Sequence, residues 1–194
     1  MRDARPWTYA ALFGSLWAAA EIVVGTLLSV AHVPMFGTLM ASVGVVCMVT
    51  ARRLQPAPGA TLVMGLVVAF LKVFFAGGLA LGAVVGILSQ ALLVELAMCL
   101  TGSRAPGAII GGALALPTAH VQRFLVAWLV TGSDTVAAFD RALQGLGASF
   151  GVKGSATLAL LAYLVAFNMV LGVLIGAFAW RVAGRVRGRL RGRA

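Results

Sequence analysis

Six apolar stretches, separated by short segments rich in proline, glycine and arginine, make up most of this chain of 194 residues. A helix that crosses a bilayer needs about 20 mostly apolar residues. The candidates are residues 8–31, 35–50, 60–76, 79–100, 108–130 and 155–180. Helix breakers lie between them, among them Pro34, Pro58 and Pro106. The sequence therefore predicts an all-α polytopic membrane protein, a bundle of six transmembrane helices.

The composition agrees with a chain that stays in the bilayer. Hydrophobic residues make up 61% of it and charged residues 10%, whereas soluble domains are nearer half apolar and a quarter charged. At this length we expect residues 1–194 to form a single transmembrane domain. Cys47 and Cys99 each lie in an apolar run without a neighbouring histidine, so we interpret them as packing residues.

The positions of the basic residues predict which way the bundle faces. If the N-terminus is cytoplasmic, eleven of the fifteen lysines and arginines fall in cytoplasmic segments, six of them in residues 181–194. Only Arg141 and Lys153 then lie outside. This asymmetry follows the positive-inside rule and predicts a multi-pass protein of the cell (inner or plasma) membrane with both termini cytoplasmic. We interpret the basic tail, residues 181–194, as a contact for anionic lipid headgroups and not for nucleic acid.

The longest connection, residues 132–154, is predicted to lie outside. Ser133 or Asp134 is suited to cap a short helix that places Leu143 and Leu146 on one face. Two interpretations stay open, a lid or short interfacial helix and a simple connector.

Four ionisable side chains lie inside apolar stretches: Glu21, Lys72, Glu95 and Arg123. A charge in the hydrocarbon region is costly, so such residues normally face the protein interior and find partners there. With a rise of about 1.5 Å per residue, polar groups from separate helices reach one layer just outside the midplane. The residues that we expect to bind a substrate there are Glu21, Lys72, Gln90, His120 and Arg123. The polar residues expected to support them are His32, Glu95, Gln122 and Asn168.

Three interpretations of this polar layer stay open. Glu21 with Lys72, and Glu95 with Arg123, are candidates for ion pairs that only fix helix register. A mixed set of acids and bases also suits a polar or zwitterionic ligand, with its carboxylate or phosphate near the lysine and arginine. A metal site at Glu21, His120 and His32 is less favoured, because Lys72 and Arg123 would repel a cation, and we expect no metal. Pro117, one turn before His120, is expected to open its helix.

Small residues recur at every fourth position and predict close helix contacts. The first span carries two such ridges, offset by one residue. The ridges of the first span are Ala10, Gly14 and Ala18, and Ala11, Ser15 and Ala19. Further pairs are Gly82 with Gly86 and Gly172 with Gly176.

Absent motifs narrow the function classes. The sequence has no G-x4-G-K-[ST] phosphate loop, so the chain is not expected to energise anything by itself. It also has no G-x-S-x-G or H-E-x-x-H motif. We therefore expect no enzyme and no cofactor, and a lipid-modifying enzyme with Glu95 or His120 as base is the least favoured alternative.

In its size, six spans, cytoplasmic termini and small-residue ridge on the first span, the chain resembles the S components of energy-coupling factor (ECF) transporters. These are the substrate-capturing membrane subunits of vitamin and metal importers. The resemblance implies that a small molecule binds from outside among the polar residues of the central layer. It further implies that one ridge of the first span contacts a coupling transmembrane subunit, while ATPase subunits drive transport.

Two other classes compete with this interpretation. An ion-coupled small carrier would use Glu21 or Glu95 as a titrating group, but six spans without evident inverted halves disfavour it. A structural or assembly subunit would keep the buried ion pairs and bind nothing. The sequence carries no signature that names a substrate.

Overall fold

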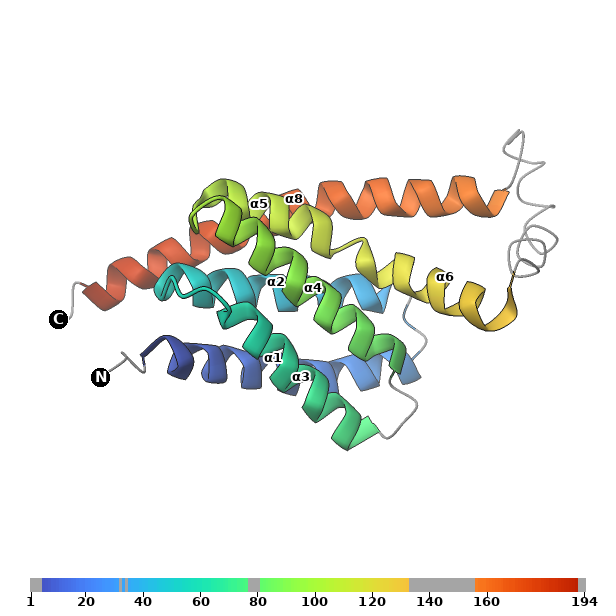
Figure 1. Ribbon diagram of the computed structural model, residues 1–194, viewed down its shortest axis with the longest axis horizontal. Helices are drawn as coiled ribbons and strands as arrows, with labels where there is room; N and C mark the ends of the chain where they lie inside the picture. Colours follow the sequence, from blue (N-terminus) through green and yellow to red (C-terminus); the bar gives the residue numbers. More distant parts are fainter. Residues whose placement is uncertain (1–4, 32, 34, 77–80, 133–155, 192–194) are drawn as a thin grey trace.

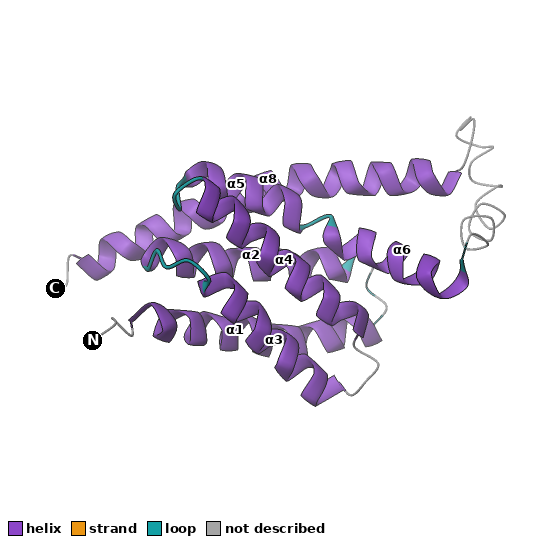
Figure 2. Ribbon diagram, viewed as in Figure 1, coloured by secondary structure: helices purple, strands orange, loops and turns teal. Residues whose placement is uncertain are grey.

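Seven α-helices make up nearly all of the part that the computed structural model describes, which is residues 5–31, 33, 35–76, 81–132 and 156–191 (Figure 1). The helices are α1 (Arg5–Val30), α2 (Phe36–Leu54), α3 (Ala60–Ala76), α4 (Leu81–Leu100), α5 (Ala105–Ala115), α6 (Thr118–Thr131) and α8 (Ala156–Arg191). Among these residues no strand is present (Figure 2). Most of the predicted exterior connection, including its proposed short helix, lies outside the described residues.

Four of the helices are long and apolar enough to cross a membrane. They are α1, α2, α4 and α8, while α3 is apolar but shorter. Since α5 and α6 together occupy the fifth predicted stretch, all six stretches are helical. The prediction of an all-α fold is confirmed for the described residues, and the apolar helices support a membrane protein.

The fifth stretch is broken in the middle. Residues 108–130 were expected to form one span, but α5 ends at Ala115 and α6 begins at Thr118. Pro117 causes the break, because proline has no N–H and its ring clashes with the preceding turn. The Thr118 hydroxyl donates a hydrogen bond to the carbonyl of Ala115 (2.6 Å) and so satisfies one acceptor freed by the break.

The last helix is longer than predicted. The sixth span was expected to end at Trp180, but α8 continues to Arg191 and has 36 residues. At about 1.5 Å per residue α8 is about 54 Å long, against an apolar core of about 30 Å. Arginine is a good helix former and no proline interrupts the segment, so the predicted basic tail extends the helix. Arg181, Arg185 and Arg189 are exposed along this extension.

Six of the seven described helices pack in a closed ring, each against two neighbours. The order of main contacts is α1, α3, α4, α5, α8, α2 and back to α1. The predicted pair Gly172 and Gly176 of α8 packs on α5, where a Cβ on Gly172 would lie 2.2 Å from the carbonyl oxygen of Gly112. Small residues thus let these two backbones meet, as expected of such ridges in membranes.

Arginines from three parts of the chain gather at one end of the bundle. Arg52 and Arg53 end α2, Arg104 precedes α5, and residues 181–191 end α8. The start of α1 and the end of α8 also lie at this end (Figure 1). We call it the arginine end.

Candidate functional site

Glu95 of α4 is buried near the arginine end, and its carboxylate is fully engaged. It accepts hydrogen bonds from the backbone N–H groups of Gly59 (2.7 Å) and Thr61 (3.1 Å) and from the Thr61 hydroxyl. The Cys99 thiol donates a further one (3.0 Å). Arg52 forms an ion pair with it, Nη2 lying 3.2 Å from Oε1. We call these residues the Glu95 cluster.

The described ion-pair partner of Glu95 is therefore Arg52, whereas the sequence analysis offered Arg123. Glu95 lies five residues before the end of α4, near the end of α2 and the start of α3. Arg123 belongs to α6, which follows the break at Pro117 and runs toward the end of the bundle opposite the termini (Figure 1). Arg52, expected in a cytoplasmic segment, is instead almost completely buried. Cys99 is exposed and joins the cluster, whereas Cys47 is buried as expected of a packing residue.

The second buried acid, Glu21 of α1, has one charged partner among the described side chains. Lys72 of α3 donates from Nζ to Glu21 Oε2 (2.9 Å) and to the backbone carbonyl of Glu21 (3.0 Å). Both side chains are largely buried, with 11% and 15% of their surface exposed for Glu21 and Lys72. The predicted ion pair between these two residues is confirmed.

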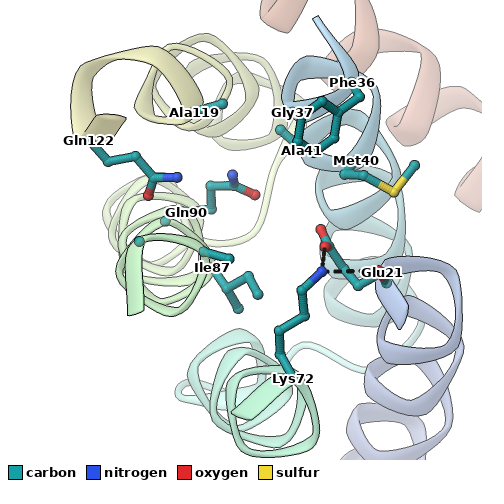
Figure 3. Close-up of a pocket in the computed structure, with 13 residues that line it drawn as sticks. Glu21, Phe36, Gly37, Met40, Ala41, Lys72, Ile87, Gln90, Ala119 and Gln122 are labelled. Carbon is teal, nitrogen blue, oxygen red and sulfur yellow. Dashed lines mark hydrogen bonds and ion pairs between the residues drawn. The ribbon is translucent and has the colours of Figure 1, made fainter. Parts of the chain in front are cut away.

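A cavity of about 180 Å³ lies against this ion pair, between α1, α2, α3, α4 and α6. Figure 3 shows the pair on one side and the amides of Gln90 and Gln122 on the other. Three of the five residues predicted to bind a substrate line it, Glu21, Lys72 and Gln90, and the supporting residue Gln122 lines it too. The sequence analysis therefore found the polar residues of this cavity.

The two glutamines are incompletely paired. The side-chain carbonyl oxygens of Gln90 and Gln122 are buried and have no hydrogen-bond partner. Among the described residues only two other side-chain atoms share this condition, Nε1 of Trp17 and Nε of Arg52. A buried polar group without a partner costs about 1–3 kcal/mol. Two of the four unpaired atoms among the described side chains thus belong to residues that line one cavity.

The remaining wall of the cavity is small or apolar. Phe36, Met40 and Ile87 supply its larger side chains. Gly86 brings α4 close to α6, because a Cβ there would lie 2.0 Å from the Gln122 side-chain oxygen. A Cβ on Gly82, which also lines the cavity, would meet nothing within 4 Å. The apolar members carried no signal in the sequence that distinguishes them from other buried residues.

His120 and Asn168 belong to a separate hydrogen-bonded chain. The Thr38 hydroxyl of α2 donates to Asn168 Oδ1 of α8 (2.8 Å) and lies 3.0 Å from His120 Nε2 of α6. A hydroxyl has one proton, so His120 Nε2 must carry a hydrogen and donate it to Thr38. Asn168 in turn donates to the carbonyl of Leu164 (2.8 Å). These residues join three helices. His120 was predicted to bind the substrate, but it does not line the cavity.

Two predicted residues fall outside the description. His32 is one, and the other is the side chain of Arg123, whose backbone belongs to α6. In the part of the chain that is described, no group of three or more His, Cys, Asp or Glu side chains is arranged to hold a metal ion.

The two ridges of α1 have different surroundings. Ala10, Gly14 and Ala18 are buried, and Gly14 faces Met64 of α3. The other ridge consists of Ala11, Ser15 and Ala19, and all three residues are exposed. Only the second ridge is open to another subunit or to lipid.

No protein-family model, no curated protein and no solved structure matches this chain. The interpretation of the cavity therefore depends on its own geometry and chemistry.

Proposed function

We propose that this protein is the substrate-capturing membrane subunit of an importer of the ECF type, and that it is not an enzyme. The observation that supports this function best is the cavity between Glu21, Lys72, Gln90 and Gln122. Charged and amide side chains from separate helices converge on open space there. Apolar side chains would pack the bundle without the cost of removing charges from water.

The position of the cavity supports capture from outside. It is lined by residues at the start of α2 and α4, Phe36 and Gly82, and by Lys72 near the end of α3. These helix ends point away from the arginine end (Figure 1). Under the positive-inside rule the arginine end and both termini are cytoplasmic, and the cavity lies in the exterior half.

The size of the cavity supports a small solute. An engineered apolar cavity of about 150 Å³ is large enough to bind benzene, and pockets for drug-sized ligands have about 300–1,000 Å³. A space of about 180 Å³ thus suits a ring or short chain with one or two polar groups. We propose a small polar micronutrient as the substrate.

The exposed ridge of α1 supports a partner in the membrane. Ala11, Ser15 and Ala19 let another helix approach closely, and they are not used within the bundle. We assign this ridge, and not Ala10, Gly14 and Ala18, to a coupling transmembrane subunit that links the protein to ATPase subunits.

Native mass spectrometry of gently purified protein tests the capture function. We expect the wild type to retain a small molecule and Lys72→Ala to lose it, because Lys72 holds Glu21 at the cavity wall. Arg181→Ala is the matched control, since Arg181 is exposed on α8 and far from the cavity. Equal retention by Lys72→Ala, or no retained molecule in the wild type, would contradict the proposal.

A further inference from the structure

We propose that the cavity takes a neutral molecule with N–H donors, of the amide, lactam or urea class, and not an ionised ligand. This inference depends on the proposed capture function and narrows its substrate class. It departs from the expectation of a carboxylate or phosphate near the lysine. Two properties of the cavity carry it: its charge balance and its unpaired acceptors.

The described side chains that line the cavity are balanced in charge. They include one carboxylate, Glu21, and one ammonium group, Lys72, and these two are already paired at 2.9 Å. Lys72 donates a second hydrogen bond to the Glu21 backbone carbonyl. An anion would have to compete with Glu21 for the lysine, and a cation would add charge beside that lysine. Either charge would be buried without a full partner, which is more costly than burying a neutral polar group.

The opposite side of the cavity carries two hydrogen-bond acceptors that lack a donor. The carbonyl oxygens of Gln90 and Gln122 are both unpaired, and Gln90 is 94% buried because only 6% of its surface is exposed. The last torsion of a glutamine side chain is broad, so each amide can turn its oxygen toward a ligand. A ligand with N–H groups would satisfy these acceptors, and its own carbonyl could accept from the amide NH₂ groups. Primary amides read such paired donor and acceptor edges, as glutamine does with adenine.

A set of three isosteric probes tests the ligand class directly. Benzamide, benzoate and benzamidinium have the same number of non-hydrogen atoms and nearly the same shape, but they are neutral, negative and positive. We expect benzamide in excess over its Kd to raise the thermal midpoint of the purified protein by about 3 °C or more. The two ions are expected to leave the midpoint unchanged.

Two glycine variants show whether the effect arises in the cavity. Gly82→Leu places a side chain where a Cβ meets no atom within 4 Å, so it is expected to fill the cavity and abolish the benzamide shift. Gly188→Leu is the matched control, because Gly188 also lies in a helix with open space around it, on the basic extension of α8. The shift should persist in this control.

A third variant tests the role of the amide. Gln90→Met keeps the length of the side chain but removes its donor and acceptor. We expect at least about tenfold weaker benzamide binding, since a lost hydrogen bond to a buried group is worth this much. The unliganded variant should unfold at the same temperature or a higher one, because an unpaired polar atom is gone. A residue with a purely structural role would not show this combination.

The outcomes separate the ligand class from the capture function. A shift with benzoate or benzamidinium that Gly82→Leu abolishes overturns the neutral class and leaves capture intact. If no probe shifts the midpoint but native mass spectrometry finds a solute that Gly82→Leu loses, the class is again wrong and capture stands. If no probe acts and no solute is found, both proposals fail.

Discussion

The protein buries two glutamates with basic partners, and the two sites differ in what surrounds them. Glu95, near the arginine end, receives donors from Gly59, Thr61, Cys99 and Arg52, and it does not line the cavity. Glu21, in the other half, is paired with Lys72 beside a cavity of about 180 Å³. An acid whose acceptors are filled from the surrounding chain stabilises the fold, and one that borders open space is available to a ligand.

The Glu95 cluster holds together parts of the chain that are far apart in sequence. Its donors come from the end of α2, the turn before α3, the start of α3 and α4 itself. At the same end, Arg53 donates to the carbonyl of Trp180 and lies over its ring at 4.0 Å, which adds α8. These polar contacts thus join α2, α3, α4 and α8 at this end of the bundle.

Removing the acid of the cluster should give the largest effect. Glu95→Ala leaves Arg52 buried without its acidic partner and two backbone N–H groups unpaired, so we expect a loss of about 3–5 kcal/mol in the free energy of unfolding. Chemical or thermal unfolding of the purified protein measures it. A loss no larger than that of Glu21→Ala would remove the distinction between the two sites.

Breaking the Glu21–Lys72 pair should have a smaller effect on stability and a larger one on binding. Lys72→Met or Glu21→Met is expected to cost about 1–3 kcal/mol, because the remaining charge stays partly desolvated but borders the cavity. The double variant should recover most of that stability, since replacing both charges by apolar groups is often neutral. It should still fail to retain a solute. Recovery of retention together with stability would show that the pair serves only the fold.

Single hydrogen bonds should show the smallest difference. Thr61→Val keeps the shape of the side chain but removes the hydroxyl donor to Glu95, so we expect a loss of about 1–2 kcal/mol. Unfolding experiments under the conditions used for Glu95→Ala measure it. An unchanged stability would mean that the remaining donors satisfy Glu95, and that the Thr61 hydroxyl does not contribute to stability.

Several features of the fold could be predicted because they depend on local chemistry. Apolar length predicted the six helical stretches, and the missing N–H of Pro117 predicted where the fifth would open. The pairing of Glu21 with Lys72 also followed from depth, since both chains enter from the same side and the residues lie at similar distances along their helices. The predicted end of the last helix was wrong, because a drop in hydropathy ends a membrane span but does not end a helix.

Pairings that depend on which helices are neighbours could not be predicted in this way. Depth alone left Glu95 and Arg123 as plausible partners. In the structure, Arg52 at the end of α2 and Gly59 in the turn before α3 contact Glu95. His120 was expected in one layer with Gln90, yet its Nε2 contacts Thr38, which in turn donates to Asn168. Spacing along one helix gives a level and a face, and it does not say which other helix covers that face.

The sequence by itself determined that this chain forms helices apolar enough to span a membrane, and which of its polar residues would be too costly to leave in lipid, because both follow from transfer of side chains out of water. Only the tertiary structure decided which of those residues close on one another and which border a cavity. It also decided which ridge of α1 is buried inside the bundle and which is exposed. The buried ridge is Ala10, Gly14 and Ala18, and the exposed one is Ala11, Ser15 and Ala19. The physical reason is that satisfaction of a buried polar group, and exposure of a ridge, are properties of neighbours from distant parts of the chain.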